Sequence, residues 1–373
     1  MSSKNNNRRR FARALIAGLL VASSMPPWGW WPLAFVGLAM FTSLELTATR
    51  ARQRFTTGFV FGLGWFFPAL AWMWFLTSPG YIVGVAMYAS LHGLASLVVV
   101  RKDNNRSFLF LSPVAHMLIE VLRMCVPFGG VPLATLGIAQ VGGPLHRVAS
   151  IGGVILLSWL TWQVGALLAK RPRDFSVDHQ HRRMLWALCL LVFVGSYVAP
   201  RGSNTGRDFH VVAVQGGGPQ GTRAINTNPR DVVERHLSAT RTINNNDNPI
   251  DLVVWPENVI DVADFETSEE LAEIGAEASR LNAPFAVGIT EDVNRAHFTN
   301  AQVIVTTDSE ATSRYDKVRR VPFGEYMPMR SFLKSLGAPV DQVPRDALAG
   351  TEPAFLDVPT ATGNERIGVV ISW

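Results

Sequence analysis

Long apolar segments, separated by short basic connections, dominate the first 200 residues and restrict the folds that this chain can adopt. A helix needs about 20 residues to cross a hydrocarbon layer of about 30 Å, and most of these segments are near that length. The series therefore predicts an α-helical membrane bundle of about seven spans. The expected spans are Phe11 to Ser24, Trp31 to Ala48, Thr57 to Leu76, Tyr81 to Val100, Phe108 to Val126, Val148 to Ala169 and Met184 to Ala199.

The first segment allows a second interpretation, because it is short for a span. Arg8, Arg9 and Arg10 precede its apolar run, which is also the composition of a signal peptide. Cleavage of such a peptide would leave the orientation of the later segments unchanged, since the mature chain would then begin outside the cytoplasm.

The positions of lysine and arginine predict the direction of the bundle, because cytoplasmic loops are enriched in both residues. The connections around Pro26 to Trp30, Thr77 to Gly80 and Pro127 to Leu145 contain neither. An odd number of spans with a cytoplasmic start places the residues after Pro200 outside a bacterial cytoplasmic membrane. The basic residues lie in the N-terminal tail and in the alternate connections: Lys4, Arg8 to Arg10, Arg50, Arg52, Arg54, Arg101, Lys102, Arg106, Lys170, Arg171, Arg173, Arg182 and Arg183.

The composition changes near Pro200, where an apolar half gives way to the mixed charge of a water-soluble domain. We therefore expect two domains, at residues 1–200 and 201–373. A net charge of +5 and a pI near 9.5 would suit nucleic acid only if the basic residues formed a face or a stripe. Most of them instead separate apolar segments, so we expect no nucleic-acid partner.

Cysteine, histidine and acidic residues give little sign of a metal site. Cys125 and Cys189 both lie in the apolar half, so residues 201–373 contain neither a disulfide nor a CxxC zinc motif. His92, His116 and Glu120 lie within or near expected spans, where ionisable groups are a functional hint. Their spacing matches no metal motif, and a packed polar contact explains them equally well.

From Phe209 the pattern changes to short β-branched runs that alternate with amphipathic helices, which predicts a layered α/β domain. The expected strands are Phe209 to Val214, Leu252 to Trp255, Phe285 to Ile289, Ala301 to Thr306 and Arg366 to Ile371. The expected helices are Arg230 to Asn244 and Ser268 to Leu281, the second capped by Thr267 or Ser268.

Two carboxylates and a lysine in this half have positions that suit catalysis. Glu257 follows the apolar strand LVVW and Pro256, so a carboxylate at the rim of a sheet could act as a general base. Its alternative role is a turn or N-cap acid. Lys317 lies in the run YDKVRRVPFGEYMP, whose prolines and glycine predict a rigid loop, and a cation held there could stabilise an oxyanion. Glu325 in the same loop could orient this lysine. The alternative is that Lys317 is an ordinary surface lysine, which is what its segment considered alone would suggest.

Ser372 is a further candidate. It ends the apolar run IGVVIS, which we expect to be a buried strand that presents its last side chain to a cleft. Its alternative role is a simple strand-end hydroxyl. No GxSxG motif precedes it, so the sequence does not indicate a nucleophile elbow.

The order of these segments resembles a known family. VVWPEN at Val253 to Asn258, YDKVRRVPFGEYMP at Tyr315 to Pro328 and IGVVISW at Ile367 to Trp373 are similar to the Glu, Lys and Cys segments of the nitrilase superfamily. Its membrane-anchored branch, the apolipoprotein N-acyltransferases, is suggested by the PFGEYMP loop and by three further stretches. These are AVQGG at Ala213 to Gly217, TNAQVIV around Asn300 and PFGGVPLATLGIAQ at Pro127 to Gln140.

The resemblance implies that the soluble domain is an α-β-β-α sandwich and that the reaction is acyl transfer without metal or soluble cofactor. The donor would be a membrane phospholipid, and the acceptor the N-terminal amine of a diacylglyceryl-cysteine on an apolipoprotein. By position, Glu257 would be the general base, Lys317 the oxyanion-stabilising cation and Glu325 the auxiliary acid.

The chain departs from the family in two ways. Ser372 occupies the position of the nucleophilic cysteine, and a hydroxyl is a much weaker nucleophile than a thiol at neutral pH. The family pattern also continues beyond Trp373, so we expect the sandwich to be incomplete at its C-terminus. Both departures argue against full activity and leave two alternatives. One is a pseudoenzyme that binds lipid or lipoprotein or supports a partner membrane enzyme, and the other is a membrane-tethered amidohydrolase.

Overall fold

The computed structural model forms two compact units, Met1–Ser203 and Asn204–Trp373, which we call the helical unit and the sheet unit. The structure describes residues 3–75, 77–99, 107–172, 179–203, 206, 208–217, 228–244, 249–360 and 363–371, and the side chains from residue 6 onwards. Several residues of the sequence predictions lie outside this description: Arg101, Lys102, Arg106, Arg173, Ser372, Trp373 and the side chain of Lys4.

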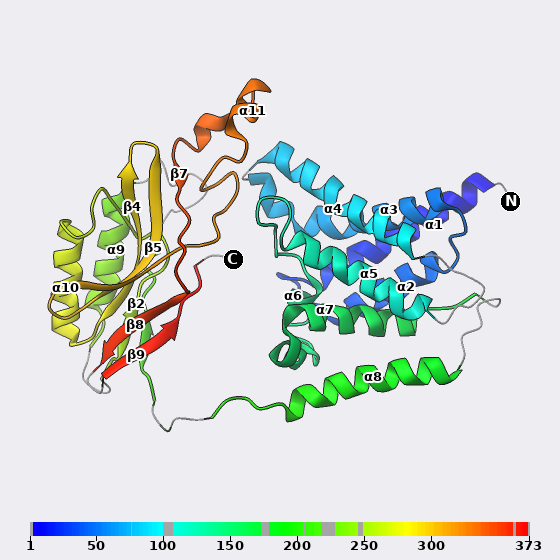
Figure 1. Ribbon diagram of the computed structural model, residues 1–373, viewed down its shortest axis with the longest axis horizontal. Coiled ribbons are helices and arrows are strands. Elements are labelled where there is room, and N and C mark those ends of the chain that lie inside the picture. The colour runs from blue at the N-terminus through cyan, green and yellow to red at the C-terminus, as the bar shows by residue number, and fades with distance from the viewer. Residues whose placement is uncertain are drawn as a thin grey trace. The chain divides into compact units, whose positions relative to one another are not determined.

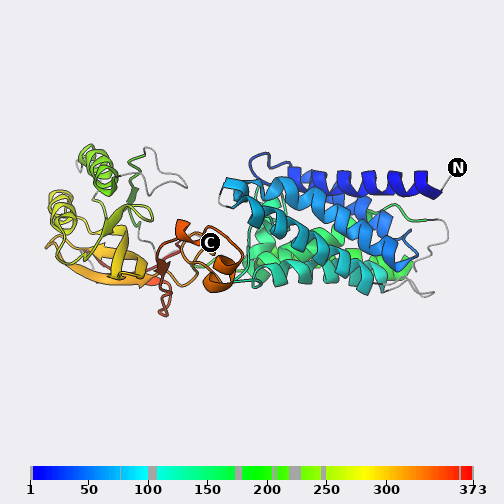
Figure 2. The ribbon, with the colours of Figure 1, turned by 90° about the horizontal axis from the view of Figure 1, so that it is seen from above.

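Long helices make up the described part of the helical unit, and α3 packs against both α1 and α4 (Figures 1 and 2). Two stretches, Ser78–Val98 and His146–Leu168, are long and apolar enough to cross a membrane, and α2 is a shorter apolar helix. The elements are α1 Ser3–Ser23, α2 Pro32–Glu45, α3 Ala51–Ala69, η1 Ala71–Phe75, α4 Ser78–Val98, α5 Phe108–Arg123, α6 Leu136–Ala139, η2 His146–Val148, α7 Ala149–Leu168 and α8 His179–Val198.

Several helices differ in extent from the expected spans. The expected span Thr57 to Leu76 is divided, because α3 ends at Ala69, next to Pro68, and the chain continues as the short helix η1. A proline inside a helix removes a hydrogen bond and blocks the preceding turn, which explains the early end. Helix α1 begins before Phe11, because the polar residues of the N-terminal tail continue its helix.

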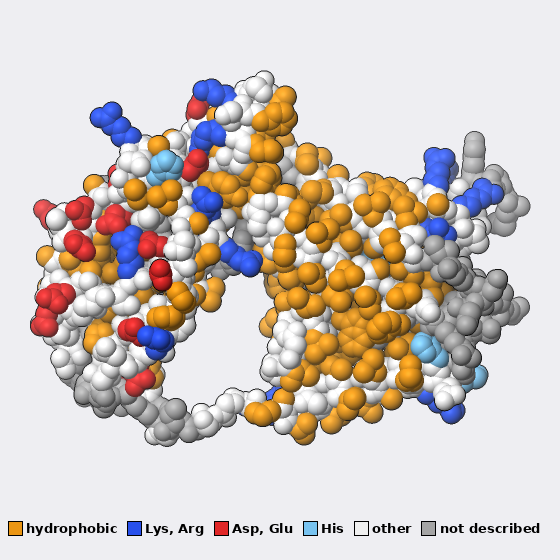
Figure 3. All heavy atoms as spheres, in the orientation of Figure 1, with side chains coloured by type: hydrophobic (Ala, Val, Ile, Leu, Met, Phe, Trp, Pro, Cys, Tyr) orange, Lys and Arg blue, Asp and Glu red, His pale blue; other side chains and the backbone are white. Residues whose placement is uncertain are grey.

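The surface of the helical unit is mainly apolar on the face that Figure 3 displays, whereas charged side chains gather over the sheet unit and at one end of the helical unit. Exposed aliphatic side chains come from several helices. They include Leu15, Ile82, Val83, Leu94, Leu118, Leu168, Leu190 and Leu191. A soluble protein rarely exposes so much contiguous apolar surface, and a hydrocarbon environment would cover it.

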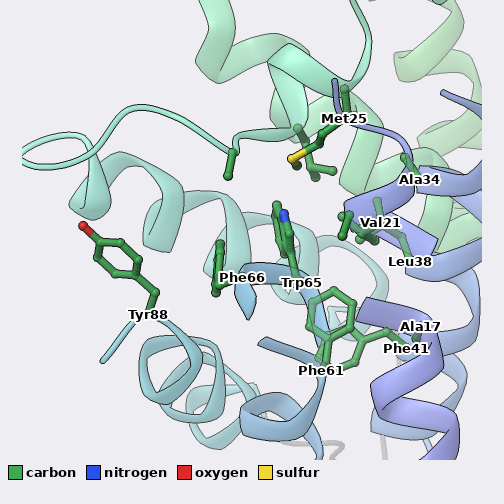
Figure 4. Packing of buried hydrophobic residues seen from close by; sticks show 14 of the residues in the cluster. Ala17, Val21, Met25, Ala34, Leu38, Phe41, Phe61, Trp65, Phe66 and Tyr88 are labelled. Atoms are coloured by element: carbon green, nitrogen blue, oxygen red, sulfur yellow. The ribbon is translucent and has the colours of Figure 1, made fainter. Parts of the chain in front are cut away.

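Glycines allow the helices of this unit to approach closely. A Cβ atom at Gly62 of α3 would lie 2.6 Å from the Cα atom of Ala89 in α4, and one at Gly58 would lie 2.5 Å from the carbonyl oxygen of His92. Small residues at four-residue spacing are a common contact between membrane helices, where packing rather than water exclusion drives association. Beside this contact Phe41, Phe61 and Trp65 form a buried aromatic core (Figure 4).

A polar cluster joins α2, α4 and α5 inside this apolar bundle. Glu45 accepts hydrogen bonds from the hydroxyls of Ser96 and Ser112, and lies 3.1 Å from Nε2 of His116. The Nδ1 atom of His116 is 2.9 Å from Nδ1 of His92, and all of these side chains are buried. A packed polar contact, one of the two interpretations left open for the two histidines, is therefore present, with Glu45 as a partner that the sequence analysis did not identify.

Glu120 forms a second polar cluster with α7 and with the connection that contains α6. Its carboxylate accepts hydrogen bonds from the backbone N–H of Leu136, the hydroxyl of Ser158 and the indole N–H of Trp162. Arg123, one turn further along α5, donates to the carbonyl oxygen of Leu133. Both ionisable side chains thus hold the 127–140 connection against the bundle.

The sheet unit is built on a seven-stranded mixed sheet with the order β1-β2-β4-β5-β6, in which β3 also pairs with β4 and β7 with β5. A hairpin of β8 and β9 forms a separate two-stranded sheet. The elements are β1 Val211–Ala213, α9 Pro229–Arg241, β2 Leu252–Val254, β3 Ile260–Val262, α10 Glu269–Leu281, β4 Phe285–Asn294, β5 His297–Val305, β6 Ala311–Asp316, α11 Arg330–Ser335, η4 Val340–Gln342, β7 Asp346–Ala347, β8 Phe355–Thr360 and β9 Gly363–Gly368.

Alternating side chains of the central strands cover the two faces of the large sheet, as the period of two in a β-strand requires. Val253 and Phe285 contribute to one core, together with residues of α9 and α10, whereas Leu252 and Ala286 face a second core with residues of the β8–β9 hairpin. Helix α10 begins at Glu269, and the Ser268 hydroxyl accepts from the Leu271 N–H, which confirms Ser268 as its cap.

The expected strand Arg366 to Ile371 was wrong in extent and in burial. Strand β9 ends at Gly368, opposite Phe355, and its side chains are half-buried or exposed because it pairs only with β8. Val369 to Ile371 continue without strand pairing, and Val370 is almost fully exposed.

Candidate active site

Glu257 lies in a short loop that interrupts the pairing along one edge of β4. The Trp255 N–H donates to the Ala286 carbonyl and the Val259 N–H to the Gly288 carbonyl, while Pro256 has no N–H to continue the ladder. A Cβ atom at Gly288 would lie 2.2 Å from the Pro256 carbonyl oxygen, so only glycine lets the loop approach this strand. Glu257 therefore lies at the rim of the sheet, as the sequence predicted.

Lys317 directly follows β6 and is buried, with only 3% of its side chain exposed. Its backbone N–H donates to the carbonyl oxygen of Asn300 in the neighbouring strand β5, and its own carbonyl accepts from Gly350. Because the main chain is fixed on both sides, the ammonium group has a defined position. The interpretation of Lys317 as a surface lysine is excluded.

The chain after Lys317 forms the rigid loop that its prolines predict, and the structure places no helix or named strand between residues 317 and 328. Glu325 holds this loop closed, since its backbone N–H donates to the Val321 carbonyl and its Oε2 atom accepts from the Val321 N–H. A further bond from the Ala347 N–H to the Glu325 carbonyl ties the loop to β7.

These elements bring four side chains into one hydrogen-bonded cluster. The Nζ atom of Lys317 donates to Oε1 of Glu257 at 2.8 Å and to Oε1 of Glu325 at 2.7 Å. The Nδ2 atom of Asn300 donates to the same two oxygens, at 2.7 Å and 3.0 Å. The three residues that the sequence singled out in the described part of this unit are therefore in direct contact, although 60 positions separate Glu257 from Lys317.

Asn300 is the member of the cluster whose role the sequence analysis missed. It appeared there only as part of a strand that resembles the family. The available signal was an amide at the start of a run that is apolar except for Gln302. Asn300 is 2% exposed.

The two carboxylates have different surroundings, which suggests different chemical roles. Glu325 uses both oxygens within the cluster and its loop, and 14% of its side chain is exposed. Glu257 uses only Oε1, and among the described residues its Oε2 atom has no hydrogen-bond partner, while 30% of its side chain is exposed. An ionised carboxylate with one free oxygen at an accessible position can accept a proton.

A cavity of about 290 Å³ adjoins Glu257. Its walls come from the large sheet and the Glu257 loop on one side, and from the β8–β9 hairpin and the three residues that follow it on the other. Apolar side chains and backbone dominate the lining, and Glu257 and Gln302 are its polar members. The residues are Val254, Trp255, Pro256, Glu257, Ala286, Gln302, Leu356 and Ile367 to Ile371. Ser372 follows this lining directly in the chain and lies outside the described residues.

Comparison with known proteins identifies related sequences for both units. The model of the apolipoprotein N-acyltransferase N-terminal domain matches residues 17–167, and the carbon-nitrogen hydrolase model matches residues 211–373. The second model is that of the nitrilase superfamily, and the mixed sheet with its helical layer is consistent with that fold.

Curated apolipoprotein N-acyltransferases are similar over most of the chain. The protein from Pseudomonas paraeruginosa is 28% identical over 87% of this chain and 66% of its own length. The protein from Mycolicibacterium smegmatis is 30% identical over 88% of this chain and 60% of its own length, and that from Geobacter metallireducens is 27% identical over 98% and 73%. This chain thus spans about two thirds of the length of such relatives. With a family domain matched in each unit and curated members similar over most of its length, the chain belongs to the apolipoprotein N-acyltransferase family.

Proposed function

We propose that this protein transfers a fatty acyl chain from a membrane phospholipid to the N-terminal amine of a diacylglyceryl-cysteine on an apolipoprotein. The observation that carries the proposal is the cluster in which Glu257 and Lys317 are in direct contact beside a mainly apolar cavity, in a chain of this family. Both substrates are lipids anchored in a bilayer, and the apolar surface of the helical unit supports a membrane location.

In the proposed first step, the nucleophilic side-chain atom at position 372 bonds to the acyl carbon of the phospholipid. At the same time, Oε2 of Glu257 accepts the proton of this nucleophile. The carbonyl oxygen of the ester becomes negatively charged in the tetrahedral intermediate. Lys317 has three N–H donors, and the described residues supply acceptors for two of them, Glu257 and Glu325. The third can donate to the developing oxyanion, where preorganised charge has its largest effect.

The intermediate then collapses by cleaving the bond to the glycerol oxygen, which leaves as a lysophospholipid hydroxyl with the proton held by Glu257. In the second step the lipoprotein amine attacks the acyl-enzyme, the amide bond forms, and the nucleophile regains a proton. Glu325 takes no part in proton transfer here. Its two engaged oxygens suit it to hold Lys317 and the loop in place.

The test of this function is incubation of the protein in phospholipid nanodiscs with a phospholipid that carries an isotope-labelled acyl chain, followed by mass spectrometry. Label on the peptide that contains Ser372, chased by a diacylglyceryl-cysteine peptide into an amide, would support acyl transfer. Release of labelled free fatty acid without amide would indicate a hydrolase. Saturable phospholipid binding with neither product would indicate a lipid-binding pseudoenzyme, which the serine at position 372 favours.

We further propose that the helical unit spans a bacterial cytoplasmic membrane about seven times and that the sheet unit, an α-β-β-α sandwich, lies outside. The basis is the lysine and arginine asymmetry of the connections. An enzymatic reporter that is active only outside the cytoplasm, fused after Arg201, should be active, and one fused after Arg54 should be inactive. The opposite result would place the site on the cytoplasmic leaflet and overturn the span count.

A further inference from the structure

Asn300 occupies the centre of the site without carrying charge. The two glutamate oxygens that accept from it, Oε1 of Glu257 and Oε1 of Glu325, are the same atoms that accept from Lys317. Each carboxylate oxygen therefore receives one donor from an ammonium and one from an amide. The side chain also sits on a fixed strand, because its backbone carbonyl accepts from the Lys317 N–H.

The charge of the cluster explains why a neutral donor is needed there. Two carboxylates and one ammonium leave a net charge of −1 in a mostly buried position, where like charges repel strongly. A second cation in place of Asn300 would neutralise the cluster but would compete with Lys317 for Glu257. An amide stabilises both carboxylates and leaves Lys317 as the only cation among the described members of the cluster.

The orientation of the amide follows from the same chemistry. Both neighbours of Nδ2 are carboxylate oxygens, which only accept hydrogen bonds when ionised. Turning the amide would place Oδ1 against two acceptors, so the nitrogen must face the glutamates. Oδ1 is buried and has no hydrogen-bond partner among the described residues, so the contacts that fix Asn300 are those of its nitrogen.

We propose that Asn300 is a positioning residue that holds Glu257 and Glu325 on Lys317, and thereby keeps Oε2 of Glu257 as the free, proton-accepting oxygen. This inference rests on the proposed function and extends it, because it gives the site a member that neither reacts nor carries charge. Without Asn300, each Oε1 atom would retain only Lys317, and the Glu257 carboxylate could rotate about its side-chain bonds.

The first test measures turnover in the full chain in nanodiscs, with Ser372→Cys as the parent. Asn300→Leu should lower kcat for acylation about 10- to 100-fold, the range expected for loss of a hydrogen bond to a charged group. KM for phospholipid should change less than about twofold, because the side chain of Asn300 donates to the two glutamates and its proposed role is in positioning rather than in lipid binding. Thr299→Val is the matched control, since Thr299 lies next to Asn300 and bonds to Arg314 away from the cluster.

The second test needs no activity. Asn300→Asp has nearly the same shape but adds a third carboxylate, so it should lower the melting temperature of the otherwise unmodified protein more than Asn300→Leu does at pH 8. This excess should disappear as the pH falls towards about 4, where carboxylates become protonated and the repulsion ends.

The two tests separate failure of the inference from failure of the proposed function. If the Ser372→Cys parent forms no acyl adduct, the acyltransferase assignment fails, and the melting series alone decides on Asn300. If the parent is acylated and Asn300→Leu reacts as fast as Thr299→Val, the positioning role is wrong. Equal melting of the Asp and Leu variants at pH 8 would also overturn it.

Discussion

Replacement of Lys317 by methionine is expected to slow acylation about 100- to 1,000-fold, the usual cost of removing one preorganised oxyanion donor. The loss should appear in kcat, with phospholipid binding almost unchanged, because the oxyanion that Lys317 is proposed to stabilise forms only during the reaction. The measurement is acyl-enzyme formation by the Ser372→Cys protein in nanodiscs, compared with and without Lys317→Met, together with binding of a labelled phospholipid.

The structure changes the choice of control for this experiment. Arg319 and Arg320 carry the same charge as Lys317 and lie in the same loop, so both are candidate controls. Arg319 is exposed, but Arg320 stacks on the Tyr326 ring at 4.5 Å and donates to the Ala347 carbonyl, so it supports the loop. Arg319→Met is therefore the matched control.

Lys317→Met also leaves two carboxylates without their cation, so its melting temperature must be measured beside its activity. An equal loss in Arg319→Met, or no loss in Lys317→Met, would mean that the loop only attracts lipid electrostatically.

The second large effect is expected at position 372. A thiol titrates near pH 8.5 and reacts readily as the thiolate, whereas a serine hydroxyl stays protonated at neutral pH unless a base is matched to it. Ser372→Cys should therefore produce or greatly increase a phospholipid-derived acyl adduct on residue 372, detected by mass spectrometry after incubation with the labelled lipid. The original protein, measured under the same conditions, provides the baseline.

Addition of Glu257→Gln should remove the gain that cysteine gives, because general bases typically contribute about 10²- to 10⁴-fold. Glutamine keeps the carbonyl oxygen that accepts from Lys317 and Asn300, so the change removes the proton acceptor with little alteration of shape. Asp264, an exposed carboxylate in the loop after β3, serves as a matched control in Asp264→Asn. A Ser372→Cys protein that forms no adduct would support the pseudoenzyme, and an adduct unaffected by Glu257→Gln would show that another group is the base.

Local sequence determined a large part of the secondary structure. Apolar length predicted the long helices of the first half, and short β-branched runs predicted strands at the positions of β2, β4 and β5. Two predictions that depend on neighbouring residues are confirmed: Ser268 caps α10, and the segment 317–328, with its prolines, forms a loop. Such features depend on backbone geometry over a single turn or a few strand residues, so the sequence carries them directly.

The contacts that make a site depended instead on strand order and register. Asn300 approaches Glu257 and Glu325 only because β5 lies between β4 and β6 and its pairing sets Asn300 beside the end of β6. A shift of one residue would turn the amide to the opposite face of the sheet. In the same way, Glu45 meets His116 across 71 positions through helix packing. The sequence could therefore indicate which residue types carry the chemistry, whereas the sharing of carboxylate oxygens between Lys317 and Asn300 was decided by tertiary structure, because hydrogen bonds over such separations exist only once the strands have paired.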